Sequence, residues 1–120
     1  MCQMVDLDIG GKTIKVADIK SDYIKNIIDC ISKCSLIDKV VLFGSAIEAR
    51  CTEDSDIDIA VFGRASKNKA FRDKSYIDYV NSVVSYGDVQ DYDILYFDIN
   101  RDYDSTIMQD INDGKVLFER

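Results

Sequence analysis

A Gly-Ser pair followed by two closely spaced aspartates constrains this chain more than any other feature. Gly44-Ser45 follows the apolar run 40–43, and Asp56-Ile57-Asp58 leads into a second apolar run that ends at Phe62. The pattern predicts a strand, a small-residue turn, a connection and a second strand that carries paired carboxylates. Asp makes up 19 of the 120 residues, so paired carboxylates alone carry little information. The complete spacing has roughly a one-in-a-hundred chance of arising from this composition, and it is therefore informative.

The length of 120 residues predicts one domain, residues 1–120, with room for one sheet and a few helices. Hydrophobic residues make up 47% of the chain, and no Pro-, Gly- or Ser-rich segment suggests a linker. Short apolar segments alternate with helical patterns along the chain. We therefore expect an α+β (mixed α/β) fold, with a small mixed sheet and helices packed against it.

The first third of the chain contains a hairpin signal and a helix signal. Residues 3–9 and 12–16 flank Gly10-Gly11, and a Gly-Gly pair supplies the positive φ angles of a two-residue turn. This predicts an N-terminal β-hairpin, residues 1–16, as an extension of the domain. Ile residues at helical spacing then predict a helix over about 22–35, with Ser21 as its N-cap.

The segments around the Gly-Ser pair have a different character. The run 40–43 is entirely apolar, as expected of a strand in the middle of a sheet. Residues 46–50 are good helix formers, and one or two helical turns there would place Ser45 at a helix N-terminus. In the strand that follows, a period of two puts Asp56 and Asp58 on one face.

The second half of the chain predicts a long helix followed by a strand. Apolar residues at helical spacing indicate a helix from residue 69 to about residue 85, with Gly87 as its C-cap. Residues 91–97 then alternate as in a strand, with Asp91 and Asp93 on the same face.

The last segment predicts a short helix and an edge strand. Asp104 or Ser105 is a suitable cap for the helix, and Gly114 is a suitable end. Residues 115–119 are expected to add the edge strand.

Charge and hydropathy exclude several classes of function. A net charge of −7 argues against nucleic acid as a direct substrate, because such binding needs clustered Lys and Arg. The same charge is compatible with a nucleotide whose phosphates reach the acids through Mg²⁺. The sequence contains no long apolar run and no signal peptide pattern, which predicts a cytoplasmic protein without a membrane partner.

The four cysteines are expected to be reduced thiols. Cys30 and Cys34 lie four residues apart in the predicted helix, Cys2 is terminal, and Cys51 precedes the carboxylates. The chain has no His and no CxxC pair, so the usual ligand set of zinc is missing.

The Gly-Ser pair and the carboxylates together suggest a metal and nucleotide site. Two carboxylates one residue apart on a strand can reach one cation, and Mg²⁺ prefers such oxygen ligands. Gly44 allows close approach of the backbone to a ligand, and Ser45 can donate its hydroxyl. The competing interpretations are a solvated strand face for the acids and an ordinary turn for the Gly-Ser pair.

Gly44-Ser45, ten residues and Asp56-Ile57-Asp58 resemble the signature of the nucleotidyltransferase superfamily related to DNA polymerase β. Residues 17–120 are similar to the minimal nucleotidyltransferases, small proteins that often act as antitoxins beside a partner of the HEPN type. The likeness includes the runs 40–43 and 59–61, the later strand Asp93-Ile94-Leu95 and the tail 111–118.

The resemblance implies a role for each residue of the motif. Asp56, Asp58 and Asp93 would bind Mg²⁺, with two ions expected, and Asp93 is the candidate general base. Asp91 competes with Asp93 for that role. Gly44, Ser45 and Ser55 would bind the nucleotide. The implied reaction is attack of a hydroxyl on the α-phosphorus of a nucleoside triphosphate, most simply ATP, with pyrophosphate leaving.

The chain departs from the family pattern at two positions. Many members have a basic residue where Glu48 stands and Gly where Ala49 stands. Both departures concern the phosphate side of the site and leave the three acids intact, so metal binding is more firmly implied than transfer.

Three functions follow from these expectations. The first is transfer of AMP to a hydroxyl, namely a tyrosine of a HEPN-type toxin, by an antitoxin. The second is a non-catalytic antitoxin that neutralises its partner by contact, favoured by the two departures and by seven Tyr residues, a type enriched at interfaces. A small-molecule nucleotidyltransferase ranks last, because it would need more chain for an acceptor pocket.

Overall fold

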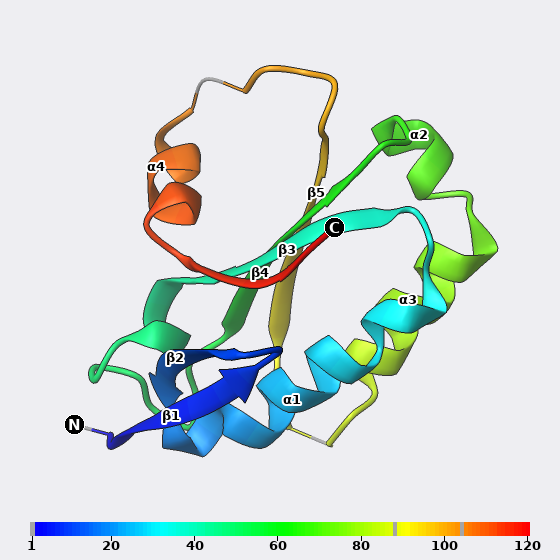
Figure 1. Ribbon diagram of the computed structural model, residues 1–120. Helices are drawn as coiled ribbons and strands as arrows, with labels where there is room; N and C mark the ends of the chain where they lie inside the picture. The colour runs from blue at the N-terminus through cyan, green and yellow to red at the C-terminus, as the bar shows by residue number, and fades with distance from the viewer. Residues whose placement is uncertain (1, 88, 104) are drawn as a thin grey trace.

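The protein is built on a four-stranded mixed sheet, seen in a computed structural model that describes residues 2–87, 89–103 and 105–120 (Figure 1). The strand order is β5 (Tyr92–Asp98), β4 (Ile57–Gly63), β3 (Ile37–Phe43) and β6 (Lys115–Glu119). Strand β3 runs antiparallel to β4 and to β6, whereas β4 and β5 are parallel. The predicted α+β class is confirmed.

The apolar strand predicted at 40–43 is the C-terminal part of β3, which lies between β4 and β6. Residues 40 to 43 are all buried, because helices cover both faces of the sheet at this strand. The strand predicted at 115–119 is β6, which forms one edge of the sheet.

The predicted N-terminal hairpin is also confirmed. Strands β1 (Met4–Ile9) and β2 (Lys12–Ala17) pair antiparallel, and the turn residues Gly10 and Gly11 have φ angles of 54° and 94°. These angles favour glycine, as the Gly-Gly signal implied. The hairpin forms a separate two-stranded sheet that packs its inward side chains Leu7, Ile14 and Val16 into the main core.

The first helix differs from its prediction at both ends. Helix α1 spans Ser21–Asp29, and the remainder of the predicted range 22–35 contains the 3₁₀ turn η2 (Ile31–Lys33). Ser21 is the first helical residue and not the N-cap, because the 3₁₀ turn η1 (Asp18–Lys20) runs directly into the helix. No side chain caps α1 in the described structure.

The long helix predicted at 69–85 is two helices, α2 (Lys67–Ala70) and α3 (Lys74–Val84). The break occurs because the Asp73 carboxylate accepts hydrogen bonds from the backbone N–H groups of Ser75 (2.9 Å) and Tyr76 (3.2 Å). This N-cap starts a new helix. The pKa of Asp73 is lowered, chiefly by a hydrogen bond from the Ser75 hydroxyl and then by the bond from the Tyr76 N–H group. Gly87 has the expected positive φ of 78° but follows the end of α3 by three residues.

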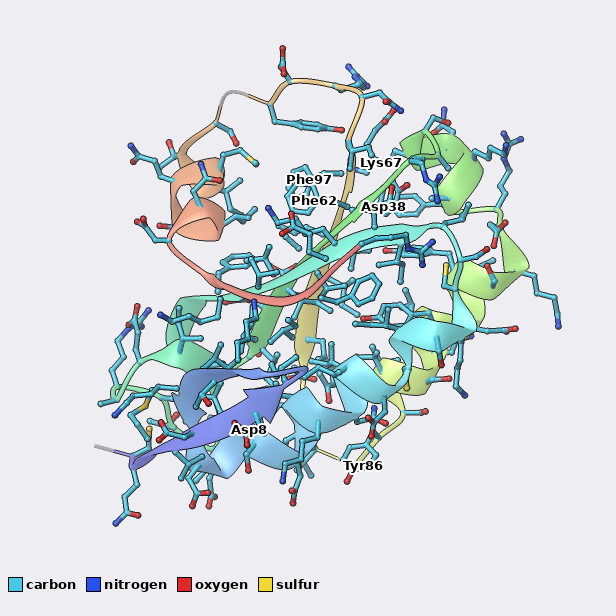
Figure 2. The ribbon with its side chains drawn as sticks, in the orientation of Figure 1. Asp8, Asp38, Phe62, Lys67, Tyr86 and Phe97 are labelled. Atoms are coloured by element: carbon cyan, nitrogen blue, oxygen red, sulfur yellow. The ribbon has the colours of Figure 1, made fainter. Side chains whose placement is uncertain are left out.

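The two faces of the sheet are covered unequally. Helices α1 and α3 and the hairpin cover one face, and α4 (Thr106–Asn112) packs on the other (Figure 1). The N-cap of α4 is Ser105, without a side-chain bond, while the alternative cap, Asp104, lies outside the described residues. On the α4 face, Phe62 and Phe97 stack with ring centroids 5.2 Å apart (Figure 2).

Two further expectations concern the cysteines and membranes. Cys30, Cys34 and Cys51 are buried free thiols, and Cys2 is a partly exposed one. Among the helices of the described ranges, none combines the length and the hydropathy that a membrane span requires.

Candidate active site

The parallel pairing of β4 with β5 brings two of the predicted site residues together. Asp58 and Asp93 are register partners across these strands. Four residues further along, Phe62 and Phe97 are also register partners, and both pack on the α4 side. Because side chains alternate along a strand, Asp58 and Asp93 point to that same face.

The other two acids of this region lie just before the strands. Asp56 directly precedes β4 and is exposed, and Asp91 directly precedes β5. The backbone carbonyl of Asp91 accepts a hydrogen bond from the Ile57 N–H group at 3.0 Å. Register therefore places Asp93, and not Asp91, opposite Asp58.

Asp58 is the electrostatic centre of the group. Its pKa is raised from 3.8 to about 6, chiefly by partial burial and then by the negative charges of Asp93 and Asp56. Arg50 acts in the opposite direction and lowers this pKa. Asp93 and Asp56 thus both lie near enough to Asp58 for their charges to disfavour its ionisation.

Gly44 and Asp58, the outer members of the sequence motif, are in direct contact. Phe43 is the register partner of Asp58, so Gly44 follows the last strand residue beside that carboxylate. A Cβ atom at position 44 would collide with an Asp58 carboxylate oxygen, and φ of Gly44 is +77°. Only glycine satisfies both conditions without strain.

The segment after Gly44 is shorter than the one or two helical turns predicted at 46–50. It is a single 3₁₀ turn, η3 (Gly44–Ile47), closed by a bond of 2.9 Å from the Glu48 N–H group to the Ser45 carbonyl. The turn ends because Glu48 is extended, with φ −129° and ψ 149°. Ser45 lies within this turn and not at the N-terminus of a continuous helix.

Ser55 belongs to the loop that leads to Asp56. Its hydroxyl accepts a hydrogen bond from the Thr52 N–H group at 3.0 Å and lies 3.2 Å from the Thr52 hydroxyl. These contacts close the loop on itself. The assignment of Ser55 to nucleotide binding remains a prediction, and its hydroxyl has a structural role in the loop.

A cavity of about 220 Å³ opens beside Gly44. It is lined by Gly44, Ile47, Glu48, Arg50, Asp110 and Asp113. Two of these lining residues, Arg50 and Glu48, form an ion pair with each other. Sequence reasoning missed Arg50, although it is the one basic residue between Gly44 and Asp58. It also missed Asp110 and Asp113, since only tertiary packing brings α4 to this site.

The side chains do not form a finished metal cage. Within the described ranges, no three His, Cys, Asp or Glu side chains are close enough together to hold a metal ion. The chemistry of the donors nevertheless fits Mg²⁺, because all are carboxylates and the charges of Asp93 and Asp56 repel that of Asp58, a repulsion that a bound cation would relieve.

One protein-family model matches most of the chain. The family model described as "Polymerase beta, Nucleotidyltransferase" matches residues 25–120, which include the Gly-Ser turn and the three acids but not the hairpin. Among the curated proteins, none matches the chain. The match covers most of the 120 residues, and we conclude that the chain belongs to the polymerase β-type nucleotidyltransferase family.

Proposed function

We propose that this nucleotidyltransferase transfers AMP from ATP to a tyrosine hydroxyl of a HEPN-type toxin and thereby acts as its antitoxin. The observation that carries the transfer chemistry is the pairing of Asp58 with Asp93 beside the glycine that starts η3. The nucleotide, the acceptor and the partner follow from the resemblance to the minimal nucleotidyltransferases.

The proposed reaction forms one bond and breaks one. The acceptor oxygen bonds to the α-phosphorus, the bond from that phosphorus to the bridging oxygen breaks, and pyrophosphate leaves with the electron pair. The acceptor hydroxyl loses its proton to the carboxylate of Asp93, the general base. Asp93 suits this role because it stands on β5 at the rim of the acidic group, where it is exposed to an incoming acceptor.

Asp56, Asp58 and Asp93 would hold Mg²⁺ in this scheme. When bound, Mg²⁺ neutralises charge on the phosphates and makes the acceptor hydroxyl more acidic. The protein contributes the fixed spacing of the carboxylates, since two of them lie on paired strands. It also contributes an ionised Asp58 above its raised pKa of about 6.

Arg50 offers a replacement for the basic residue that many relatives have at position 48. It pairs with Glu48 and lies close enough to Asp58 to lower the pKa of that carboxylate. Its guanidinium lines the cavity beside Gly44, and guanidinium groups bind phosphate oxygens well. In the proposed complex Arg50 therefore contacts the triphosphate, released from Glu48 or shared with it.

The acceptor can be tested with the product of the neighbouring reading frame. The purified protein is incubated with ATP labelled on its α-phosphate, Mg²⁺ and this partner, and the labelled residue is identified by mass spectrometry. We expect AMP on a partner tyrosine. Label on RNA or on a small acceptor in place of the partner would contradict the proposed acceptor.

The second candidate is a non-catalytic antitoxin that neutralises its partner by contact. It is favoured by the absence, from the described part of the chain, of three acids arranged to hold a metal. Its support from tyrosines is weaker than the sequence suggests, because Tyr76, Tyr79 and Tyr96 are buried in the core. Replacing Asp56 and Asp58 together by Ala separates the candidates: surviving neutralisation favours contact, and lost neutralisation with an intact complex favours catalysis.

A further inference from the structure

Lys20 is a buried lysine that contacts two loops of the candidate active site. Its side chain is only 1% exposed, although it is charged. The ammonium donates hydrogen bonds to the backbone carbonyl of Glu53 at 3.0 Å and to Oε1 of Gln90 at 2.5 Å. Burying an ammonium without hydrogen-bond partners is costly, and these two bonds offset that cost. Lys20 therefore acts at this position by joining the two loops.

Gln90 links the segments that precede β4 and β5, the two strands that carry Asp58 and Asp93. Its amide nitrogen donates to the carbonyls of Ser55 (3.1 Å) and Asp91 (2.6 Å). Ser55 is one residue before Asp56, and Asp91 is two residues before Asp93. One glutamine thus ties the entry of β4 to the entry of β5, and Lys20 orients that glutamine by occupying its oxygen.

The lysine comes from a segment outside the family match, which begins at residue 25. Lys20 ends η1, directly after the hairpin, and the hairpin is fixed by its buried apolar side chains. The segment before the family match also contacts the connection between η3 and β4 at a second point, where the Cys2 N–H group donates to the Ala49 carbonyl at 2.9 Å. Residues before the family match therefore contact the loops that carry the site and can hold them in position.

We propose that Lys20 and Gln90 are positioning residues that set the spacing of Asp56 and Asp93 around Asp58. This inference rests on the proposed function, since it assumes that the acids bind a metal. Lys20 touches neither nucleotide nor acceptor and acts only through the two loops. Groups that orient metal ligands in this way commonly change metal affinity or activity by about 10–100-fold when they are removed.

The test compares Lys20→Met with Lys15→Met, a change at an exposed position on β2 of the same extension. Binding of Mn²⁺, a paramagnetic substitute for Mg²⁺, is measured by electron paramagnetic resonance. Amide hydrogen exchange is followed at Ile57, which donates to Asp91, and at Val40 in the core. Thermal unfolding shows whether each variant is folded.

For Lys20→Met we expect about tenfold weaker Mn²⁺ binding and faster exchange at Ile57, with exchange at Val40 unchanged. The kcat should fall more than the KM for ATP changes, and Lys15→Met should match the wild type. A folded Lys20→Met with wild-type Mn²⁺ affinity and wild-type exchange at Ile57 would overturn the proposal.

Gln90→Ala provides a second variant if Lys20→Met fails to fold, because it keeps the bond from Lys20 to Glu53. The same loss of Mn²⁺ affinity is expected, and wild-type affinity overturns the proposal. A wild-type protein that binds no Mn²⁺ would instead refute the proposed function. The role of Lys20 and Gln90 in joining the two loops would then be tested by the amide exchange at Ile57 alone.

Discussion

The carboxylate of Asp58 occupies the space that a side chain on Gly44 would need. The two residues are fourteen positions apart in the sequence, and they meet because Phe43 pairs with Asp58 across β3 and β4. The spacing of the motif therefore has a physical cause: the glycine lets the turn of η3 pass directly beside the central carboxylate.

Replacing Gly44 by Ala should disturb both the fold and the site. We expect a loss of about 2–3 kcal/mol in unfolding free energy, from the positive φ and from the collision with Asp58, and a large loss of transfer activity. Gly10→Ala is the matched control, because Gly10 also has a positive φ but has open space around its Cβ position. It should cost only about 1 kcal/mol and leave activity unchanged. Equal effects in chemical denaturation would mean that the contact with Asp58 is unimportant.

Asp58→Asn should remove activity while stabilising the fold. The pKa of Asp58 is raised from 3.8 to about 6, so the folded state disfavours the ionised form. At pH 7 the neutral amide should raise the unfolding free energy by about 1 kcal/mol, a value reduced for a carboxylate partly screened by solvent. Transfer should fall roughly a hundredfold or more. The control is Asp54→Asn, a change at an exposed position in the preceding loop, which should alter neither the unfolding free energy nor the transfer activity. An Asp58→Asn variant that keeps transfer activity would contradict the role of Asp58.

The raised pKa also predicts how metal binding depends on pH. As pH falls through about 6, Asp58 gains a proton in the folded protein and loses its value as a ligand. Mn²⁺ affinity should therefore decrease about tenfold for each pH unit well below 6. The free energy of unfolding changes in the opposite direction. Protonated Asp58 contributes its full stabilisation below about pH 4, and this contribution is lost as pH rises through 6. An affinity that stays constant down to pH 5 would contradict this assignment.

Arg50→Gln tests the phosphate side of the site. Removing the guanidinium from the cavity beside Gly44 should raise the KM for ATP about tenfold, the loss expected for a charge-assisted hydrogen bond. The pKa of Asp58 should rise further, because Arg50 lowers it. Arg101→Gln, at an exposed position after β5, is the control. An unchanged KM in Arg50→Gln would place the triphosphate elsewhere.

Two buried tyrosines should respond differently to loss of their hydroxyl groups. The Tyr96 hydroxyl donates to the Ala65 carbonyl at 2.7 Å, so Tyr96→Phe should cost about 1 kcal/mol. The Tyr79 hydroxyl is buried without a hydrogen-bond partner among the described residues. Tyr79→Phe should be neutral or stabilising in thermal and chemical unfolding. A larger cost at Tyr79 than at Tyr96 would contradict this packing.

Sequence periodicity predicted the strands because each has a local cause: alternation around Asp93, an unbroken apolar run before Gly44, and a Gly-Gly turn between β1 and β2. The acids of the motif were visible for the same reason. The strand order and the direction of β5 could not be predicted from local sequence patterns, since they depend on which elements pack together. The division of α2 from α3 had a local signal in the Asp73 cap, but apolar residues on both sides suggested one continuous helix.

The parts of the site that come from distant segments had no local signal. Lys20 looks like one more charged residue before a helix, and its hydrogen-bond partner Gln90 lies seventy residues later in the sequence. Asp110 and Asp113 reach the cavity only through the packing of α4 on the sheet. Arg50 was also missed, although it had a local signal: it is the one basic residue between Gly44 and Asp58.

In the proposed reaction Asp58, with Asp56 and Asp93, catalyses attack at the α-phosphorus of ATP. The most direct measurement uses two samples of ATP, one labelled on the α-phosphate and one on the γ-phosphate, with Mg²⁺, the partner protein and either the wild type or Asp58→Asn. We predict α-label on the partner, γ-label in pyrophosphate, and neither product with Asp58→Asn. No transfer of α-label by the wild type, or γ-label on the partner, would contradict the claim.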